Sequence, residues 1–344
     1  MENKLGLLER LENGVVLGAE GYVFELERRG YIKAGPFVPE VVIDFPEAVL
    51  ELHREFLRAG AEVMVALTYY GDREKLKTVG REGDLEMLNR QAVRLARQAA
   101  AEGDALVAGN ICNTWVYDHN NKTETEARVR KIYEEQVQWA VEEGIDFVIA
   151  ETLDYFGEGM IALEVIKSHN LPAMITFGST QDFLRDGYSQ VEACKILARE
   201  GADVVGLNCS RGPNTMMPIL RDIREAVDVY VAAQPVPYRT TENQYSFQSL
   251  KEAGHNRAFP IALEPFLQTR FEMADFAVEA LELSVNYIGI CCGGAPHHVR
   301  AMAEALGRTP PAGKYSPALD LHPMIGKNVK DKDQKYLEYW KDQS

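Results

Sequence analysis

The stretch DVVGLNCS, residues 203–210, sets the pattern that decides the fold. It runs through apolar residues with no polar residue at alternate positions, and it stops at an asparagine and a cysteine. A strand that is buried on both faces has this composition, because helices cover both sides of a parallel sheet. Similar runs recur along the chain, in residues 14–20 (GVVLGAE), 62–70 (EVMVALTYY), 105–112 (ALVAGNIC), 146–153 (DFVIAETL), 172–178 (PAMITFG), 229–235 (VYVAAQP) and 287–292 (YIGICC).

Amphipathic helical stretches separate these runs, as in residues 46–60 (PEAVLELHREFLRAG) and 87–103 (MLNRQAVRLARQAAAEG). Several of them end in glycine, which is common just beyond the last turn of a helix. Eight such units in this length predict a (β/α)8 TIM barrel. The competing fold is a doubly wound open sheet, and the absence of a G-x-G-x-x-G turn after the first run argues against it.

The pattern changes towards the C-terminus. Residues 236–249 (VPYRTTENQYSFQS) predict an extended loop of the barrel, and residues 260–266 (PIALEPF) a short extra element. Residues 308–323 (RTPPAGKYSPALDLHP) contain too much proline for a regular helix, whereas residues 329–344 predict a charged terminal helix. We therefore expect a barrel over residues 1–310 and a C-terminal extension over residues 311–344.

Composition excludes several classes of function. The chain has 344 residues, of which 46% are hydrophobic, and a formal net charge of −15. This charge repels phosphate backbones, so nucleic acid is not expected as a partner. No apolar run is long enough to span a membrane, and the charged N-terminus lacks the apolar region of a signal peptide. The five cysteines of this long chain predict a cytoplasmic protein that uses clustered thiols for metal binding or catalysis.

The ends of the predicted strands carry the chemistry, because a barrel of this kind builds its active site there. Three of the five cysteines fall at the ends of the sixth and eighth strands, namely Cys209, Cys291 and Cys292. Three thiolates with a fourth position open are the layout of a catalytic zinc site. The other polar or sulfur-bearing residues at strand ends are Glu20, Tyr69, Tyr70, Asn110, Cys112, Glu151 and Gln234.

Adjacent cysteines can bind one metal ion only if the backbone bends, and the two glycines after Cys292 permit that bend. A single buried cysteine is more often a small hydrophobic residue, which is the interpretation we favour for Cys194 and Cys112. His297 and His298 stand at a helix start and are not needed as ligands beside three cysteines.

The motifs GLNCS (residues 206–210) and GICCGG (residues 289–294) resemble the paired signature of the zinc-dependent homocysteine S-methyltransferase family. The resemblance to the betaine-dependent enzymes of that family extends over nearly the whole barrel. It is carried by residues 26–37 (LERRGYIKAGPF), 53–64 (HREFLRAGAEVM), 102–109 (EGDALVAG), 146–151 (DFVIAE), 262–266 (ALEPF), 287–306 (YIGICCGGAPHHVRAMAEAL) and 318–323 (ALDLHP).

The resemblance implies a (β/α)8 barrel in which Zn2+ is held by Cys209, Cys291 and Cys292 and the homocysteine thiol takes the open position. It also implies that Glu151 holds the amino group of homocysteine. The first strand departs from the family, where an aspartate is usual: this chain has Ala19, and the acid is the neighbouring Glu20. We expect Glu151 and Glu20 to act together on the thiol substrate.

The resemblance further implies a methyl donor with a positively charged onium centre, which aromatic faces hold well. Phe37 stands where the betaine enzymes have tryptophan, and Thr152 where they have tyrosine, whereas Tyr70 keeps its counterpart. Further rings for the donor can come from Tyr69, Trp115 and Tyr155. We also expect Asn208 to be one of the substrate-binding residues.

Three functions remain open from the sequence. The leading hypothesis is zinc-dependent methyl transfer from betaine, or a related methylated amine or sulfonium, to homocysteine, which gives methionine. The second keeps this chemistry with another thiol, because Ala19 replaces the family aspartate. The third is a zinc-bound protein without turnover, against which the three-cysteine set argues. Family members assemble through C-terminal segments, so a homo-oligomer is expected.

Overall fold

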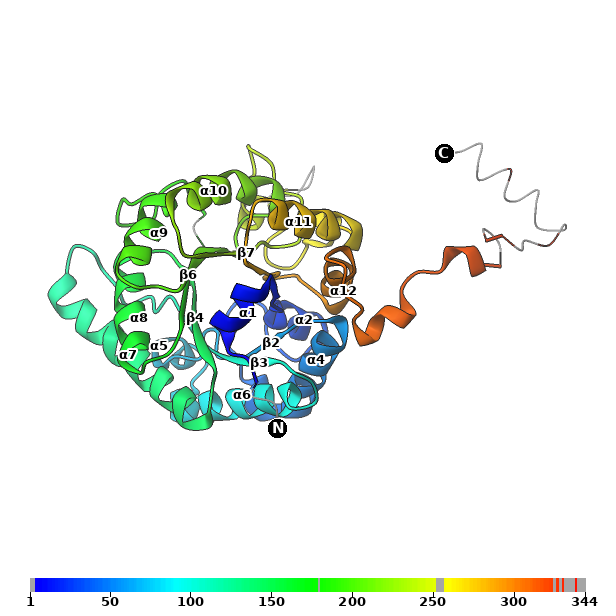
Figure 1. Cartoon of the computed structure of the whole chain (residues 1–344). Helices are drawn as coiled ribbons and strands as arrows, with labels where there is room; N and C mark the ends of the chain where they lie inside the picture. The colour runs from blue at the N-terminus through cyan, green and yellow to red at the C-terminus, as the bar shows by residue number, and fades with distance from the viewer. Residues whose placement is uncertain are drawn as a thin grey trace.

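The computed structural model describes residues 4–178, 180–251, 257–323, 326, 327, 330 and 338. Within them, eight parallel strands form one sheet with helices packed around it (Figure 1). The strands are β1 (Val16–Leu17), β2 (Val63–Val65), β3 (Leu106–Cys112), β4 (Phe147–Leu153), β5 (Ala173–Phe177), β6 (Val204–Asn208), β7 (Tyr230–Gln234) and β8 (Tyr287–Ile288). The α-helices are α1 (Leu7–Asn13), α2 (Tyr22–Arg28), α3 (Val41–Asp44), α4 (Pro46–Ala59), α5 (Arg73–Lys77), α6 (Leu85–Ala100), α7 (Lys122–Glu143), α8 (Phe156–Ser168), α9 (Gln190–Arg199), α10 (Pro213–Ala226), α11 (Arg270–Glu282) and α12 (Pro296–Ala305). Short 3-10 turns are η1 (Glu82–Asp84), η2 (Phe247–Ser249), η3 (Glu264–Phe266), η4 (Pro311–Tyr315) and η5 (Leu319–Leu321).

The sheet closes into a barrel. Its strand order is β1-β8-β7-β6-β5-β4-β3-β2, so each strand from β2 onward lies beside its neighbour in sequence. A parallel bridge between Gly18 and Val63 joins the two remaining edges, and the Glu62 amide donates to the Leu17 carbonyl at 2.8 Å. The predicted (β/α)8 barrel is therefore confirmed, and the doubly wound alternative is wrong.

The helices form where the sequence places an apolar stripe between a start and a stop signal. In α4 a proline occupies the first turn, Val49, Leu52 and Phe56 are fully buried, and Gly60 ends the helix with φ +105°. α9 begins with a capping box in which Ser189 and Glu192 bond to each other's backbone amides. α6 differs from the glycine-terminated pattern, because it ends at Ala100, before Gly103.

Strands β1 and β8 are only two residues long, much shorter than the apolar runs that contain them. Beyond each strand the chain leaves the sheet and turns over the barrel end. Glu20 then lines a cavity there, as do Cys291 and Cys292. The apolar character of these runs thus reflects burial at the barrel mouth as well as strand pairing.

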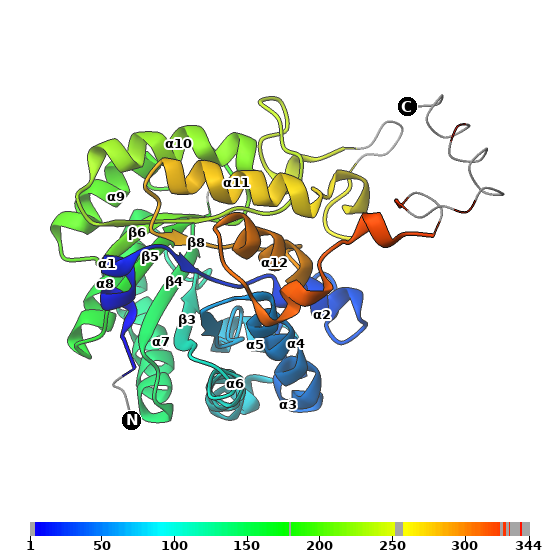
Figure 2. The ribbon, with the colours of Figure 1, turned by 45° about the vertical axis from the view of Figure 1, so that its right-hand side comes forward.

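After α12 the chain leaves the barrel, as Figures 1 and 2 show in orange. η4 stays attached to α12 because the Ser316 hydroxyl bonds to Glu304, whereas Leu319 and Leu321 in η5 are exposed. The predicted terminal helix, residues 329–344, lies outside the described residues apart from two single positions. In the described part of the chain, none of the helices combines the length and the apolar character needed to cross a bilayer.

Candidate active site

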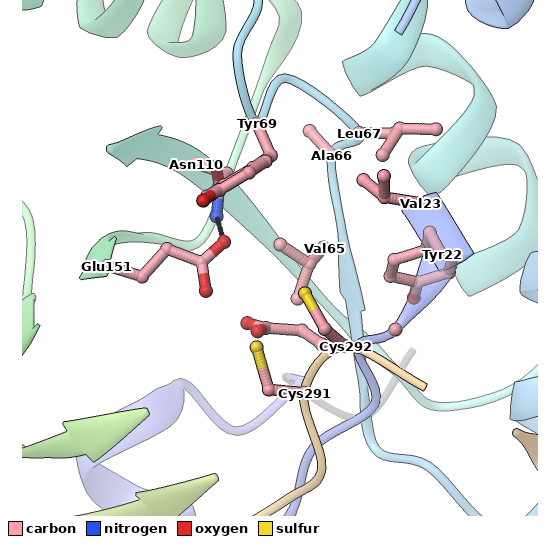
Figure 3. A pocket seen from close by; sticks show the side chains of 12 residues that line it. Tyr22, Val23, Val65, Ala66, Leu67, Tyr69, Asn110, Glu151, Cys291 and Cys292 are labelled. Atoms are coloured by element: carbon pink, nitrogen blue, oxygen red, sulfur yellow. Dashed lines mark hydrogen bonds between the residues drawn. The ribbon is translucent and has the colours of Figure 1, made fainter. Parts of the chain in front are cut away.

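Two cavities meet at the carboxyl ends of the strands. The inner cavity occupies about 380 Å³ and the outer one about 830 Å³, and both volumes include space open to solvent. Val23, Tyr69 and Cys292 line both of them, so the two spaces are contiguous. The inner cavity is lined by Glu20, Gly21, Tyr22, Val23, Val65, Ala66, Leu67, Tyr69, Asn110, Glu151, Cys291 and Cys292 (Figure 3).

Three thiols converge at the junction of the cavities. The Sγ atoms of Cys209, Cys291 and Cys292 all lie within 4.8 Å of one another. Cys209 directly follows β6, and the other two follow β8, where Gly293 has φ +90°. A Cβ atom added at Gly294 would come within 2.3 Å of the Ile290 side chain. The paired glycines therefore allow the tight bend that brings both adjacent sulfurs to one point.

The thiol cluster has the chemistry of a metal site. Cys209 and Cys291 are buried and Cys292 is half-buried. Hydrogen bonds from Cys291 and Cys292 hold the pKa of the Cys209 thiol well below its usual value. Three converging sulfurs are a donor set that soft and borderline metal ions favour, and they leave room for a further ligand from the cavities. These residues therefore fit a metal ion.

Two buried carboxyl groups face this cluster across the inner cavity. One carboxylate oxygen each of Glu20 and Glu151 lies within 4.8 Å of the other and of the Cys291 Sγ. Glu151 accepts from Asn110 Nδ2 at 2.6 Å and from Asn208 Nδ2 at 2.9 Å. Figure 3 shows the Asn110 bond and the Glu151 side chain directed towards the sulfurs of Cys291 and Cys292. Both carboxyl groups thus reach one cavity from strands that lie apart in the barrel.

The two carboxyl groups differ in their surroundings. Burial raises the pKa of both, and repulsion by Glu151 raises that of Glu20 further. A hydrogen bond between the two carboxyl groups raises the pKa of Glu20 and lowers that of Glu151, and two amide groups donate to Glu151 as well. Glu20 is therefore the group that holds a proton more readily, and Glu151 is the carboxylate. The pair can receive an ammonium group.

Asn208 supports residues of both cavities through the hydrogen bonds of its side-chain amide. It is fully buried and lines neither cavity. Besides donating to Glu151, its amide donates to Thr152 Oγ1 at 2.8 Å, and its oxygen accepts from the Thr152 amide at 2.8 Å and Thr176 Oγ1 at 2.9 Å. Asn208 thereby connects the acidic cavity to the neighbouring one, and its direct contact with substrate stays a prediction.

The outer cavity is aromatic. The Tyr69 and Tyr70 rings stack with centroids 4.3 Å apart, and Trp115 meets Tyr70 edge-on at 4.9 Å. Phe37 stacks on Phe24 at 5.2 Å on another part of the wall. The complete lining is Val23, Phe24, Phe37, Tyr69, Tyr70, Asn113, Trp115, Thr152, Asp154, Gly178, Thr180, Arg185, Cys209, Ser210, Phe247, Gln248, Phe259 and Cys292.

Backbone strain is concentrated around the outer cavity. Eight non-glycine residues of the described chain have positive φ, and six of them line this cavity. Such conformations cost free energy for residues with a side chain, and they persist where the surrounding structure enforces them. The six are Phe37, Tyr70, Trp115, Thr152, Cys209 and Ser210.

The structure thus brings together most of the residues that the sequence singles out. Phe37, Tyr69, Tyr70 and Thr152 share the outer cavity. Tyr155 does not line it and instead packs against Tyr117 at 5.1 Å.

The remaining cysteines and histidines lie in structural surroundings. Cys194 is fully buried on α9, and Cys112 accepts from the Tyr70 amide at 3.4 Å. His298 is fully buried, and its Nδ1 accepts from the Ala295 amide at 3.2 Å at the start of α12. None of these three belongs to a metal-competent cluster within the described residues.

Sequence reasoning missed three charged residues near the outer cavity. Lys75 is fully buried in the short α5, with its Nζ 4.1 Å from the Tyr70 centroid and 5.0 Å from that of Trp115. Asp154 and Arg185 line the cavity wall from the loops after β4 and β5. Lys75 lies in a charged stretch typical of an exposed helix, and the loop of Arg185 has no motif, so the sequence carried no strong signal for either.

The fold and the two cavities that meet at a thiol cluster define the class of protein: an enzyme of the (β/α)8-barrel type. Comparison with known proteins shows which family within this class the chain belongs to. The profile of the homocysteine S-methyltransferase family matches residues 21–306. The chain belongs to this family, and it is accordingly an S-methyltransferase; methyl transfer to homocysteine is the activity that membership supports.

Comparisons with individual relatives support this family assignment. The chain is 38% identical over 338 residues to betaine–homocysteine S-methyltransferase 1 of Mus musculus, covering 93% of this chain and 81% of the relative. It is 36% identical over 334 residues to S-methylmethionine–homocysteine S-methyltransferase of Pongo abelii, covering 93% of this chain and 88% of the relative. The crystal structure of the metallated homocysteine methyltransferase MmuM from Escherichia coli shares the fold, with a TM-score of 0.66 and 20% identity over 85% of this chain and 96% of that chain.

Proposed function

We propose that this enzyme transfers a methyl group from an onium donor to the thiolate of homocysteine, with Zn2+ held by Cys209, Cys291 and Cys292. One observation carries the proposal: the thiol cluster lies where an acidic cavity and an aromatic cavity meet. Bound Zn2+ would lower the pKa of a coordinated substrate thiol, so that the nucleophilic thiolate is present at neutral pH.

The inner cavity suits the acceptor. Glu151, with Glu20 beside it, offers negative charge for the amino group of homocysteine, and the distance to the cysteine sulfurs is short enough for one small molecule to reach both. Burial excludes water from this pair, which strengthens its attraction for an ammonium group. Glu151 and Glu20 would therefore orient the acceptor so that its sulfur points towards the outer cavity.

The outer cavity suits the donor. Phe37, Tyr69 and Tyr70 provide ring faces for a methylated cation. The acceptor sulfur attacks the methyl carbon, a sulfur–carbon bond forms, and the bond from methyl to the onium nitrogen or sulfur breaks. The leaving group takes that electron pair and departs as a neutral amine or sulfide. The protein contributes alignment of the three atoms, which accounts for much of the acceleration in such displacements.

The test is methionine formation, detected by mass, from homocysteine and a panel of methylated amines and sulfoniums. We expect methionine and the matching demethylated donor in equal amounts. Cys209→Ala should abolish turnover, and Cys194→Ala, which changes a buried helical cysteine, should retain it. Absence of methionine with every onium donor from zinc-loaded protein would overturn the proposal.

A second acceptor class is favoured by one observation. No described residue that lines the inner cavity has a basic side chain to pair with the carboxylate of homocysteine. A thiol with an amino group and no carboxylate would fit the same acidic pair. Parallel assays with homocysteine and cysteamine distinguish the two, and faster methylation of cysteamine would favour the second class.

We also propose that residues 311–344 form an extension of the barrel domain that contacts another copy of the chain. The exposed leucines of η5, Leu319 and Leu321, support this. Removing residues 311–344 should reduce the number of chains per particle, measured by light scattering, and an unchanged number would contradict the proposal.

A further inference from the structure

Lys75 is a buried lysine whose charge takes no part in the proposed chemistry. Its side chain is fully buried and lines neither cavity. An ammonium group has three N–H donors, and it is costly to bury unless it is paired and hydrogen-bonded. Three oxygen acceptors surround this one: Asp72 Oδ2 at 3.2 Å, Asn113 Oδ1 at 3.3 Å and the Asn113 carbonyl. The Lys75 ammonium ion is therefore held at one point in the structure.

The same ammonium group contacts two rings that form part of the outer cavity. Its Nζ lies 4.1 Å from the Tyr70 centroid and 5.0 Å from the Trp115 centroid. Tyr70 belongs to the loop after β2 and Trp115 to the loop after β3, and both rings line the cavity. A cation at such distances is attracted to aromatic rings. Lys75 therefore connects two separate loops of the barrel mouth through the rings that these loops present.

Both rings are carried by strained backbone. The φ angle is +59° at Tyr70 and +62° at Trp115, in the left-handed region. Such conformations cost free energy for residues with a side chain, and they persist where surrounding contacts enforce them. The Lys75 ammonium is a contact that both residues share. It also lies 3.5 Å from Cys112 Sγ, which accepts from the Tyr70 amide at 3.4 Å.

We propose that Lys75 is a positioning residue for the methyl donor, and that its buried ammonium holds Tyr70 and Trp115 in the conformations that form the donor wall. The inference rests on the proposed function, because that function assigns the outer cavity to the donor. Asn113 extends the connection to β4, since its Nδ2 donates to the Thr152 carbonyl at 2.7 Å. Lys75 does not line the inner cavity, so binding of the acceptor should not depend on it.

Two variants separate positioning from a contribution to stability alone. Lys75→Met keeps most of the side-chain length and removes the ammonium, but it leaves the buried Asp72 carboxylate without its counter-ion. The double variant Lys75→Met/Asp72→Asn removes both charges. The introduced asparagine can still accept from the backbone amides of residues 74 and 75, as Asp72 does at 2.9 and 3.1 Å. We therefore expect the double variant to be more stable than Lys75→Met in urea unfolding.

Calorimetric titration of the zinc-loaded full chain measures donor and acceptor binding separately. The onium probes are betaine and S-methylmethionine, and the acceptor is homocysteine, each titrated alone. We expect both variants to bind an onium probe about tenfold more weakly than the unmodified protein, and to bind homocysteine with unchanged affinity. The matched control is Lys167→Met/Asp203→Asn, which removes an ion pair at the first residue of β5 and should change neither affinity.

The double variant decides between the two roles. Recovery of onium affinity together with stability would show that Lys75 acts through stability alone, and it would overturn the inference. Unchanged onium affinity in both variants, an equal loss of homocysteine affinity, or no binding of either onium probe to the unmodified protein would overturn it as well. The expected binding pattern without methionine formation would instead refute the proposed function alone.

Discussion

The inner and outer cavities meet at the same sulfur atoms but are built on different principles. The inner one is small, and its key groups are held by amide hydrogen bonds, as Asn110 and Asn208 hold Glu151. The outer one is larger, aromatic and bordered by residues in left-handed backbone conformations. Charge therefore dominates recognition in the inner cavity, and ring placement dominates it in the outer cavity. Changes in the first should affect the acceptor, and changes in the second should affect the donor.

The largest effect is expected at the junction. Replacing any one of Cys209, Cys291 or Cys292 by alanine leaves two sulfurs, which should remove most of the bound metal and nearly all activity. Metal content is measured by elemental mass spectrometry on purified protein. Cys112→Ala is the matched control in the same barrel end and should keep its metal. Normal metal content in all three junction variants would show that the site assignment is wrong.

The next effect tests the inner cavity. Glu151→Gln removes the charge that would hold the amino group, and should raise the KM for homocysteine roughly 10- to 100-fold with little change for the donor. The fold should tolerate this substitution, because Asn110 Oδ1 has no hydrogen-bond partner among the described residues. The Asn110 side-chain amide can therefore rotate, so that its Oδ1 accepts from the amide nitrogen of the introduced glutamine. Steady-state kinetics with both substrates varied give the comparison.

Glu20→Gln should have a smaller effect than Glu151→Gln, since Glu20 is the member of the pair that holds a proton more readily. Equal changes in the KM of donor and acceptor in Glu151→Gln would contradict the division of roles between the cavities. If Glu20→Gln leaves the KM for homocysteine unchanged, Glu20 does not take the place of the aspartate that we expect in the family at the position of Ala19.

A smaller effect is expected from the rings of the outer cavity. The Tyr70 face is already engaged, with Tyr69 stacked on the ring and the Lys75 ammonium 4.1 Å from its centroid. Tyr69 lines both cavities, and none of the described residues places a cation over its ring, so Tyr69→Leu should weaken donor binding more than Tyr70→Leu. The loss of one cation–π contact is about 0.5–2 kcal/mol, which is seen as a rise in donor KM.

Thermal unfolding of both tyrosine variants serves as the control, because Tyr70→Leu also removes the ring over a buried lysine. A greater rise in donor KM for Tyr70→Leu, at comparable stability of the two variants, would place the donor on Tyr70 instead.

The same contrast explains what the sequence could predict. The eight strands and the three converging cysteines followed from apolar runs and from the rule that barrel chemistry lies at strand ends. The length of β1 and β8 did not, because residues buried at the barrel mouth are as apolar as those in the sheet. Glu20 and Glu151 were found for the same reason as the cysteines.

The outer cavity was harder to predict from the residues. Positive φ at Phe37, Tyr70 or Trp115 leaves no mark in the sequence, since glycine or asparagine is the usual signal of that conformation. The burial of Lys75 depends on the Asn113 side chain, which another segment supplies, as well as on the local Asp72. Loops that adopt enforced conformations are specified by tertiary packing, which local patterns do not encode.

The smallest effect on activity is expected in the scaffold beside the inner cavity, where a substitution changes the pH dependence of stability. His53 in α4 is fully buried next to Tyr22, and neither ring nitrogen has a partner among the described residues. Burial lowers its pKa from 6.5 to about 3. The unfolded state therefore binds a proton below pH 6.5 that the folded state refuses, so stability is lost as the pH falls from 6.5 towards 3. At pH 5 this loss is about 2 kcal/mol, from 1.5 pH units at 1.36 kcal/mol each.

His53→Leu should remove this loss. The variant should therefore lose less stability between pH 8 and pH 5 than the unmodified protein, as measured by urea unfolding. The cavities keep their own titrating groups in both proteins, so the difference between the two curves belongs to His53, and parallel curves would contradict the assignment.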